Sequence, residues 1–292
     1  MEQPDLYTIL PDPKIDGLCM ILKGEWHEKY HRIIKEKNVT SLRLSRSAGW
    51  RSADVTFLKD LDCLRGIEIY SANCKDISPI WALKSSQHIG LDCNLSKAGD
   101  FSEFTQLRTC FLRWQTKAAS ALSATCLEEL NVVNYPHDDF SQLCKLNLLK
   151  NLKITSRKLQ SLKGVQDLPR LNSLDLFQCN GITCLKPLRE ASSLQTLNLD
   201  GCKSLNDLTP LKHLGSLETL SINDCGSILS LEPLIHLEQL KHVYFAGSTI
   251  VENGSLSALM QLSNLQSISF ANRKHYDMSR TEITEALACR RG

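Results

Sequence analysis

The stretches LNSLDLFQC (Leu171–Cys179), LQTLNLDGC (Leu194–Cys202) and LETLSINDC (Leu217–Cys225) are three copies of one pattern, and each begins 23 residues after the previous one. Every copy has leucine at its first and fourth positions, leucine or isoleucine at its sixth, and cysteine at its ninth. Apolar and polar residues alternate around the fourth position, which indicates a short strand with one buried face. Repetition at this period is typical of solenoid proteins.

The same pattern extends in both directions with less exact matches, at spacings of 20 to 25 residues. One such unit cannot bury its own leucines, so stacked units are predicted to form a parallel sheet over a continuous leucine core. The fourth position of the twelve predicted copies falls at Leu18, Leu42, Ile67, Ile89, Cys110, Leu130, Leu152, Leu174, Leu197, Leu220, Val243 and Ile268.

The segments that return from one strand to the next carry a second repeated signal. LKPL (Leu185–Leu188), LTPL (Leu208–Leu211) and LEPL (Leu231–Leu234) place their prolines 23 residues apart. Proline lacks an N–H group and disfavours helix in the residue before it. The return segments are therefore predicted to be extended or 3₁₀-like rather than long helices.

These patterns resemble the leucine-rich-repeat family, in particular its 22-to-23-residue class, which includes internalins and phosphatase regulators. The resemblance covers about residues 15 to 275. It implies an α/β solenoid, a horseshoe of about twelve repeats with a parallel concave sheet and short 3₁₀ or extended convex segments. The family often has asparagine where each strand turns. Asn94 is predicted to take that place, and cysteine substitutes for it at Cys179, Cys202 and Cys225, whereas irregular turns are expected at Gln115, Tyr135 and Arg157.

The ends of a solenoid need caps that cover its terminal leucines. Residues 24–38 have a helical apolar pattern, and Ser279 with Glu282 has the spacing of a helix capping box. We expect one continuous domain, with an N-terminal cap and first repeat over 1–38, repeats over 39–276 and a C-terminal cap helix over 277–292.

Composition excludes several classes of protein. The 292 residues are 42% hydrophobic and carry a net charge of +2, so neither disorder nor general nucleic-acid binding is expected. No apolar run is long enough for a transmembrane helix, and the N-terminus lacks the features of a secretory signal. A cytoplasmic protein is expected, with its 12 cysteines as free thiols.

The sequence contains no recognised catalytic, phosphate-binding or metal-binding motif, so an enzyme, a cofactor and a metal are not expected. Two alternatives remain open. His27 and His31 are four residues apart, which is the spacing of a weak zinc signal on a helix. A reactive cysteine would reveal itself by fast thiol labelling.

The strand residues that point away from the core are expected to bind the partner. Three groups stand out: aromatic and arginine side chains in one repeat, of the types that dominate binding hot spots; an acidic group in the best-conforming repeats; and a basic group near the N-terminus. The candidate residues are Arg43, Arg46, Tyr70, Asp92, Phe111, Arg113, Trp114, Asp175, Phe177, Asp200, Asn223, Asp224 and Tyr244.

The predicted function is therefore non-catalytic binding of one folded protein, with no nucleic acid and no membrane, and the protein is expected to be a monomer or a heterodimer. The acidic group would suit a basic toxin or enzyme. The resemblance to free-standing bacterial leucine-rich-repeat proteins suggests inhibition by occlusion, as by an immunity protein. The alternative is a scaffold or substrate receptor that recruits a target to an enzyme complex.

Overall fold

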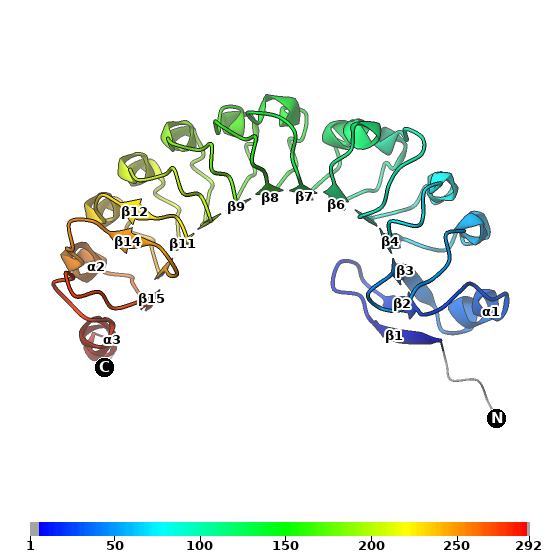
Figure 1. The fold of residues 1–292 in the computed structure, drawn as a ribbon, viewed down its shortest axis with the longest axis horizontal. Helices are drawn as coiled ribbons and strands as arrows, with labels where there is room; N and C mark the ends of the chain where they lie inside the picture. Colours follow the sequence, from blue (N-terminus) through cyan, green and yellow to red (C-terminus); the bar gives the residue numbers. More distant parts are fainter. Residues whose placement is uncertain (1–5, 291–292) are drawn as a thin grey trace. The chain divides into compact units, whose positions relative to one another are not determined.

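The computed structural model describes residues 6–290, and the chain divides into two compact units between Val132 and Val133. Each unit consists of short strands joined by return segments that contain 3₁₀ turns. Figure 1 shows that the strands of each unit line one side of its coil and that the turns line the other. This is the arrangement predicted from the leucine periodicity.

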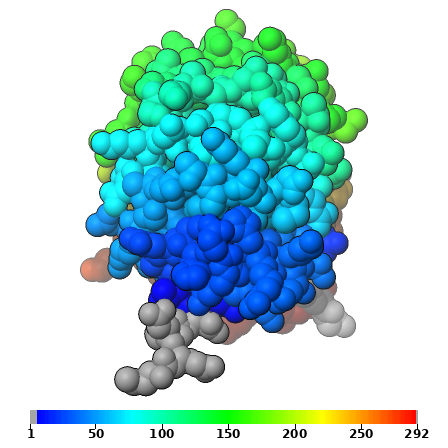
Figure 2. Space-filling view, turned by 90° about the vertical axis from the view of Figure 1, so that its right-hand side faces the viewer, coloured from blue at the N-terminus to red at the C-terminus, as the bar shows by residue number. Residues whose placement is uncertain are grey.

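The first unit begins with an antiparallel hairpin that the repeat pattern did not predict. From the second strand onward, the strands follow one another in sequence order, and their pairing is parallel from β2 through β6. Figure 2 shows the residues of this unit stacked in the same order, from blue to cyan. The elements are β1 (Tyr7–Pro11), β2 (Leu18–Leu22), α1 (Lys29–Glu36), β3 (Val39–Ser45), β4 (Gly66–Tyr70), β5 (His88–Leu91), β6 (Thr109–Arg113) and β7 (Glu129–Val133).

The second unit continues the same plan with parallel strands. A short second sheet of two parallel strands lies between the larger strands in sequence. The elements are β8 (Asn151–Thr155), β9 (Ser173–Phe177), β10 (Thr196–Asp200), β11 (Thr219–Asn223), β12 (Ser227–Ile228), β13 (His242–Phe245), β14 (Ile250–Val251), α2 (Ser257–Gln261), β15 (Ser267–Phe270) and α3 (Arg280–Cys289).

The return segments are 3₁₀ turns, as the prolines predict. Pro79, Pro187, Pro210 and Pro233 each lie at the start of one. The turns are η1 (Thr56–Asp60), η2 (Ser78–Ala82), η3 (Phe101–Glu103) and η4 (Thr116–Ser123) in the first unit, and η5 (Ser141–Leu143), η6 (Val165–Asp167), η7 (Lys186–Glu190), η8 (Thr209–His213) and η9 (Glu232–His236) in the second.

All twelve predicted core positions lie in strands, but the first was misplaced by two residues, because Met20 rather than Leu18 aligns with Leu42 and Leu18 is only half-buried. The parallel register aligns equivalent positions, so that Leu197 lies between Leu174 and Leu220, and all three are fully buried. One buried leucine contributes roughly 1.5–3 kcal/mol. Because the core of each repeat is completed by its neighbours, this contribution depends on stacking rather than on the single repeat.

The cysteines at the turns donate weak hydrogen bonds to the backbone, as expected for residues that replace asparagine. Cys225 Sγ lies 3.2 Å from the Asn223 carbonyl and 3.5 Å from that of Leu199. Cys202 Sγ makes the corresponding contacts at 3.9 and 3.7 Å, and Cys179 Sγ at 3.5 and 3.8 Å. Their thiols therefore satisfy buried carbonyl groups.

The prediction for Asn94 was wrong, because this residue is exposed and the neighbouring Cys93 is buried. Gln115 does not leave its turn unpaired: its amide donates to the Cys93 carbonyl and accepts from the Leu95 N–H at 2.8 Å. Ser156, rather than Arg157, serves the next irregular turn, where its hydroxyl donates to the Tyr135 carbonyl at 2.7 Å. In one turn the longer side-chain amide of Gln115 takes the place of the usual asparagine. In the other, Ser156 does so from one residue before the predicted position.

The N-terminal helix is shorter than predicted. Residues 24–38 were expected to be helical, but α1 begins at Lys29. Gly24 instead forms an isolated bridge with Trp50, and the Trp26 ring stacks on Phe57 with centroids 3.8 Å apart. At the other end, Ser279 and Glu282 form the predicted capping box at the start of α3.

Native thiol labelling checks this placement of the cysteines. Four of the twelve are exposed, namely Cys63, Cys144, Cys184 and Cys289, and no disulfide joins any cysteine in residues 6–290. Burial raises the pKa of Cys93 and of Cys110 to about 12, so these thiols are both covered and protonated. We expect Ellman's reagent to label about four thiols quickly and the buried ones only after unfolding. Rapid labelling of Cys179, Cys202 or Cys225 would contradict this.

Candidate functional site

The exposed strand face of the first unit carries a row of side chains set by the parallel register. Arg43 pairs with Glu68 in the neighbouring strand, Glu68 with Gly90, and Gly90 with Phe111. Because parallel strands are about 4.8 Å apart, side chains at these positions touch although they are some twenty residues apart in sequence. The row thus concentrates residues from four repeats in one place.

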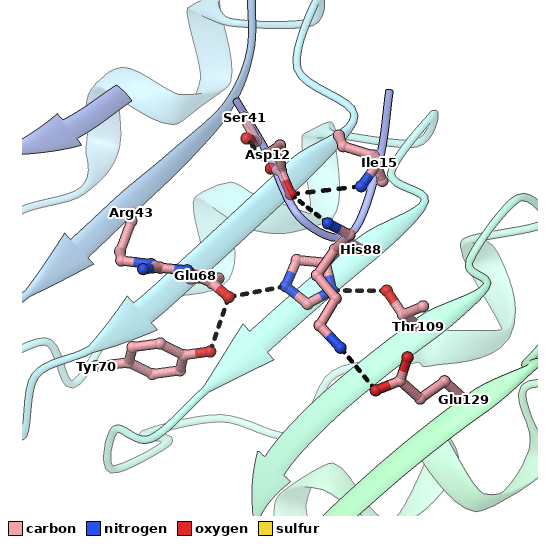
Figure 3. A network of polar contacts seen from close by, with 10 residues as sticks. Asp12, Ile15, Ser41, Arg43, Glu68, Tyr70, His88, Thr109 and Glu129 are labelled. Carbon is pink, nitrogen blue, oxygen red and sulfur yellow. Dashed lines mark hydrogen bonds and ion pairs between the residues drawn. The ribbon is translucent and has the colours of Figure 1, made fainter. Parts of the chain in front are cut away.

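Glu68 is the centre of a polar network (Figure 3). Its carboxylate accepts hydrogen bonds from the Tyr70 hydroxyl at 3.0 Å and from Arg43 Nε, and it contacts His88 Nε2 at 3.0 Å. The other ring nitrogen of His88 lies 2.6 Å from Thr109 Oγ1. Glu68 and His88 are 7% and 3% exposed, so the network is buried within the face that was predicted to be exposed.

The partners of Glu68 keep it ionised. Burial opposes the charge, but the hydrogen bonds from His88 and Arg43 and the Arg43 charge outweigh it and lower the pKa of Glu68 to about 2. Burial raises the pKa of Tyr70, and the Glu68 charge and hydrogen bond raise it further. Tyr70 therefore stays neutral, and its hydroxyl donates a hydrogen bond to the ionised carboxylate.

Tyr70 is also fixed by its aromatic neighbour. Its ring meets Phe111 edge-on, with centroids 5.5 Å apart, although a whole strand lies between them. That strand carries Gly90, where a Cβ atom would lie only 2.5 Å from the Tyr70 hydroxyl. The glycine therefore leaves the space through which Tyr70 reaches Phe111. Such aromatic pairs contribute about 0.5–1.5 kcal/mol beyond their buried area.

An ion pair of two parallel hydrogen bonds lies beside the aromatic pair. Arg113 Nε and Nη2 donate to the two carboxylate oxygens of Asp92 at 2.6 and 2.9 Å. Arg113 is exposed, and Asp92 and Trp114 are half-buried. Arg46 is exposed directly after β3, where its backbone N–H donates to the Tyr70 carbonyl at 3.0 Å. The register thus brings Arg43, Tyr70 and Phe111 into one row, and Asp92 is already neutralised by Arg113.

A cavity of about 200 Å³ opens on this face. It is lined by Lys14, Glu68, Tyr70, His88, Thr109, Cys110, Phe111, Glu129 and Asn131. Lys14 belongs to the loop between β1 and β2, and its Nζ lies 2.7 Å from Glu129 Oε1 at the start of β7. The sequence analysis missed Lys14, Glu68, His88, Thr109, Glu129 and Asn131 as site residues.

The second unit carries the predicted acidic group. Asp175 and Asp200 line a separate hollow of about 230 Å³, together with Phe177 and Asn223. Phe177 is 38% exposed. Burial, with the nearby charge of Asp224, raises the pKa of Asp200. These residues come together as predicted.

Asp224 and Tyr244 lie at the margin of this group. Asp224 has a φ of 51°, and its Oδ1 accepts the Ser248 N–H at 2.9 Å, so it holds the following turn. The Tyr244 hydroxyl lies 3.0 Å from Ser267 Oγ. Both residues therefore have local structural partners as well as an accessible surface.

Chemically, the network combines a hydroxyl, an imidazole and a carboxylate. Thr109, His88 and Glu68 thus form a hydroxyl–imidazole–carboxylate chain, an arrangement that can activate a nucleophile. Glu68 also accepts hydrogen bonds from Arg43 and Tyr70, so the same carboxylate helps to hold the aromatic face in place. Among residues 6–290, no group of three or more histidine, cysteine or acidic side chains is placed to hold a metal ion.

The repeat, the parallel sheet and the 3₁₀ returns define a leucine-rich-repeat solenoid. Solved structures agree. An internalin (InlF) from Listeria monocytogenes aligns over 89% of this chain and 86% of its own, with 19% identity and a TM-score of 0.60. The leucine-rich-repeat domain of the type III effector XopL aligns over 67% of this chain and 71% of its own, with 19% identity and a TM-score of 0.50. At such identities the likeness shows the fold alone.

No protein-family model and no curated protein matches the sequence. None of the helices within residues 6–290 has both the length and the apolar character needed to cross a bilayer.

A pH series tests the Glu68 network. Unfolded, Glu68 has a pKa near 4.5, and folding lowers it to about 2. The unfolded chain therefore binds more protons in that range, and the stability contributed by Glu68 is present above pH 4.5 and lost as the pH falls toward 2. We expect this loss to be roughly 2–3 kcal/mol in the free energy of unfolding.

Urea unfolding between pH 7 and pH 2.5 measures the effect. Glu68→Gln should be less stable than the wild type at pH 7, because Arg43 and His88 lose their anionic partner, and its stability should vary less with pH. Glu103→Gln is the matched control, since Glu103 forms an exposed pair with Lys84. Parallel pH profiles for the wild type and Glu68→Gln would refute the assignment.

Proposed function

We propose that this protein is a non-catalytic binding module that holds one folded protein partner against the strand face of its first unit. The observation that carries this proposal is the Tyr70–Phe111 pair, an aromatic surface on a polar strand face that a buried network holds in place. Phe111 shares β6 with Arg113, and Trp114 directly follows that strand. Tryptophan, tyrosine and arginine are the residues most enriched in binding hot spots.

The face is ordered in the absence of any partner. Tyr70 is fixed by Glu68 at one end and by Phe111 at its ring, and Arg113 is fixed by Asp92. Each rotamer-rich side chain that is immobilised at an interface costs about 0.5–1.5 kcal/mol. Because these side chains are already held, that cost falls on folding rather than on binding. A preorganised aromatic face of this kind favours a specific partner.

The acidic group of the second unit supports a partner with a basic surface. Asp175 and Asp200 line one hollow, and the charge of Asp224 is close enough to raise the pKa of Asp200. A basic partner would relieve this repulsion and would be steered to the surface at a rate that falls with salt. Such a partner could be a toxin or an enzyme whose own site the module occludes, as an immunity protein does.

The alternative function is a scaffold that recruits a target to an enzyme complex. It requires two proteins bound at once, whereas occlusion requires one. Stoichiometry separates the two: an occluding module gives a 1:1 complex in which the partner's activity is lost. A scaffold gives a ternary complex in which each component stays active.

Removing the aromatic surface tests the site. Phe111→Ala combined with Trp114→Ala should weaken partner binding by roughly thirtyfold or more, since hot-spot truncations cost about 2 kcal/mol or more. Capture from source cells under cross-linking would identify the partner. Calorimetry on the purified pair would then give the affinity and stoichiometry of each variant.

Two controls make the result specific. Leu229→Ala removes a side chain that is 48% exposed outside the large strands and should leave the affinity unchanged. Phe177→Ala tests the second unit. An unaltered affinity in the Phe111/Trp114 variant would reject the proposed face, and loss on Phe177→Ala alone would transfer the site to the second unit.

A further inference from the structure

The loop between β1 and β2 is seated on the strand face of the first unit. Asp12 accepts the backbone N–H of Lys14 at 2.7 Å and a hydrogen bond from the Ser41 hydroxyl of β3. Arg65 Nη2 donates to the Asp16 carbonyl at 3.1 Å. Ile15 is 9% exposed and lies over Gly66, where a Cβ atom would be 3.1 Å from its Cδ1. The loop is thus anchored at several points that do not involve the side chain of Lys14.

From this anchored loop, Lys14 reaches across the beginnings of the strands. Gly66, His88, Thr109 and Glu129 are the first residues of β4, β5, β6 and β7. Ile15 covers the first of them, and the Lys14 ammonium contacts the last, at 2.7 Å from Glu129 Oε1. Both side chains of the ion pair are about one-third exposed, at 36% and 34%. An ion pair this open to water contributes about 0.2–1 kcal/mol, so little free energy holds it closed.

The cavity beneath Lys14 has room for a hydrogen-bond donor. It has a volume of about 200 Å³, and it is walled by Tyr70 and Phe111 on one side and by Glu129 and Asn131 on another. The Oδ1 atom of Asn131 is buried and has no hydrogen-bond partner among residues 6–290. A buried acceptor without a donor costs about 1–3 kcal/mol, which a suitable ligand would recover.

The charges of the cavity specify the sign of that ligand. Glu68 is already matched by Arg43, and within residues 6–290 Glu129 is matched by Lys14 alone. An anion would meet two carboxylates, whereas a cation that takes the place of the Lys14 ammonium preserves the balance. The aromatic walls suit the aliphatic stem of a lysine or arginine and attract its charged end.

We propose that this cavity receives a basic side chain of the protein partner, and that Lys14 is a resident lid displaced from Glu129 when that side chain enters. The incoming ammonium or guanidinium group pairs with Glu129 and donates to Asn131 Oδ1. This inference rests on the proposed function, because it assigns the kind of residue that the partner inserts beside the Tyr70–Phe111 pair.

A small-molecule titration tests the cavity without the partner. The probes are N-acetyl-lysine methylamide and N-acetyl-arginine methylamide, with the neutral N-acetyl-norleucine methylamide as their control, and binding is followed in ¹H–¹⁵N spectra of the full chain. We expect the two cationic probes to shift the signals of β5 to β7 and the neutral probe not to do so. Equal binding of the norleucine probe would overturn the proposal, because it would show that the cavity binds an aliphatic side chain without regard to its charge.

Variants separate the role of Lys14, the displaced lid, from that of Glu129, which pairs with the incoming cation. Lys14→Ala should raise the affinity for the cationic probes about two- to fivefold, the equivalent of one exposed ion pair. Glu129→Gln should lower it about tenfold or more, the equivalent of one charged hydrogen bond. Lys97→Ala breaks another exposed pair of this unit, with Asp76, and should change nothing. Melting curves confirm that the variants fold, as the other loop anchors predict. Unchanged affinity in both cavity variants would overturn the proposal.

The partner complex distinguishes this inference from the proposed function. If the Phe111/Trp114 variant loses the partner while Lys14→Ala and Glu129→Gln bind it like the wild type, the binding face stands and the basic-side-chain seat is rejected. If Glu129→Gln weakens the complex and Lys14→Ala strengthens it, both stand. If the cationic probes bind through Glu129 but no variant of the face alters partner binding, the cavity stands and the proposed function fails.

Discussion

The register between neighbouring parallel strands is the constraint on which the rest of the structure depends. Each repeat leaves its leucines half-covered, and only the next repeat in the same register buries them fully, as Leu174, Leu197 and Leu220 show. The same alignment that forms the core also fixes the opposite face. A side chain that points outward in one strand must lie beside its counterparts in the next, so the strand face is assembled from residues far apart in sequence without any loop to bring them together.

That constraint explains how the Glu68 network arises. Arg43, Glu68 and His88 come from three strands, and no two of them are closer than twenty residues in the chain. A carboxylate buried without partners would take up a proton or destabilise the fold, and three donors prevent both. The ion network is thus compatible with a core built on leucine, since it lies on the other side of the sheet from that core. The network holds the side chains of Arg43, Tyr70 and His88 in fixed positions on the strand face.

The sequence predicted the fold better than the site, for a physical reason. Leucine spacing reports burial on the core side, and the predicted core positions from Leu42 to Val243 are all buried in strands. The residues that point away from the core show no comparable repeat in the sequence. Glu68 lies on the strand face that was predicted to be exposed, but alternation assigns a side chain to a face and not a depth on that face, and Tyr70, Arg43 and His88 contact it there. The β1–β2 hairpin was missed because its pairing is antiparallel and lies outside the repeat. His88 and Thr109 are the first residues of their strands, and the site prediction did not consider residues at that position.

The irregular repeats and the candidate site coincide in the first unit, and the coincidence has a structural cause. Repeats that follow the common pattern present small polar residues between their two core positions, such as Asn198 and Ser221, although Phe177 is exposed further along one of them. Tyr70 needs Gly90 on the next strand, and Phe111 needs Tyr70, so an aromatic surface requires several neighbouring repeats to depart from the pattern together. Departures that are matched in this way preserve packing, since each large side chain is offset by a small one. This matched irregularity across adjacent repeats is the structural feature that supports the binding face proposed for the first unit.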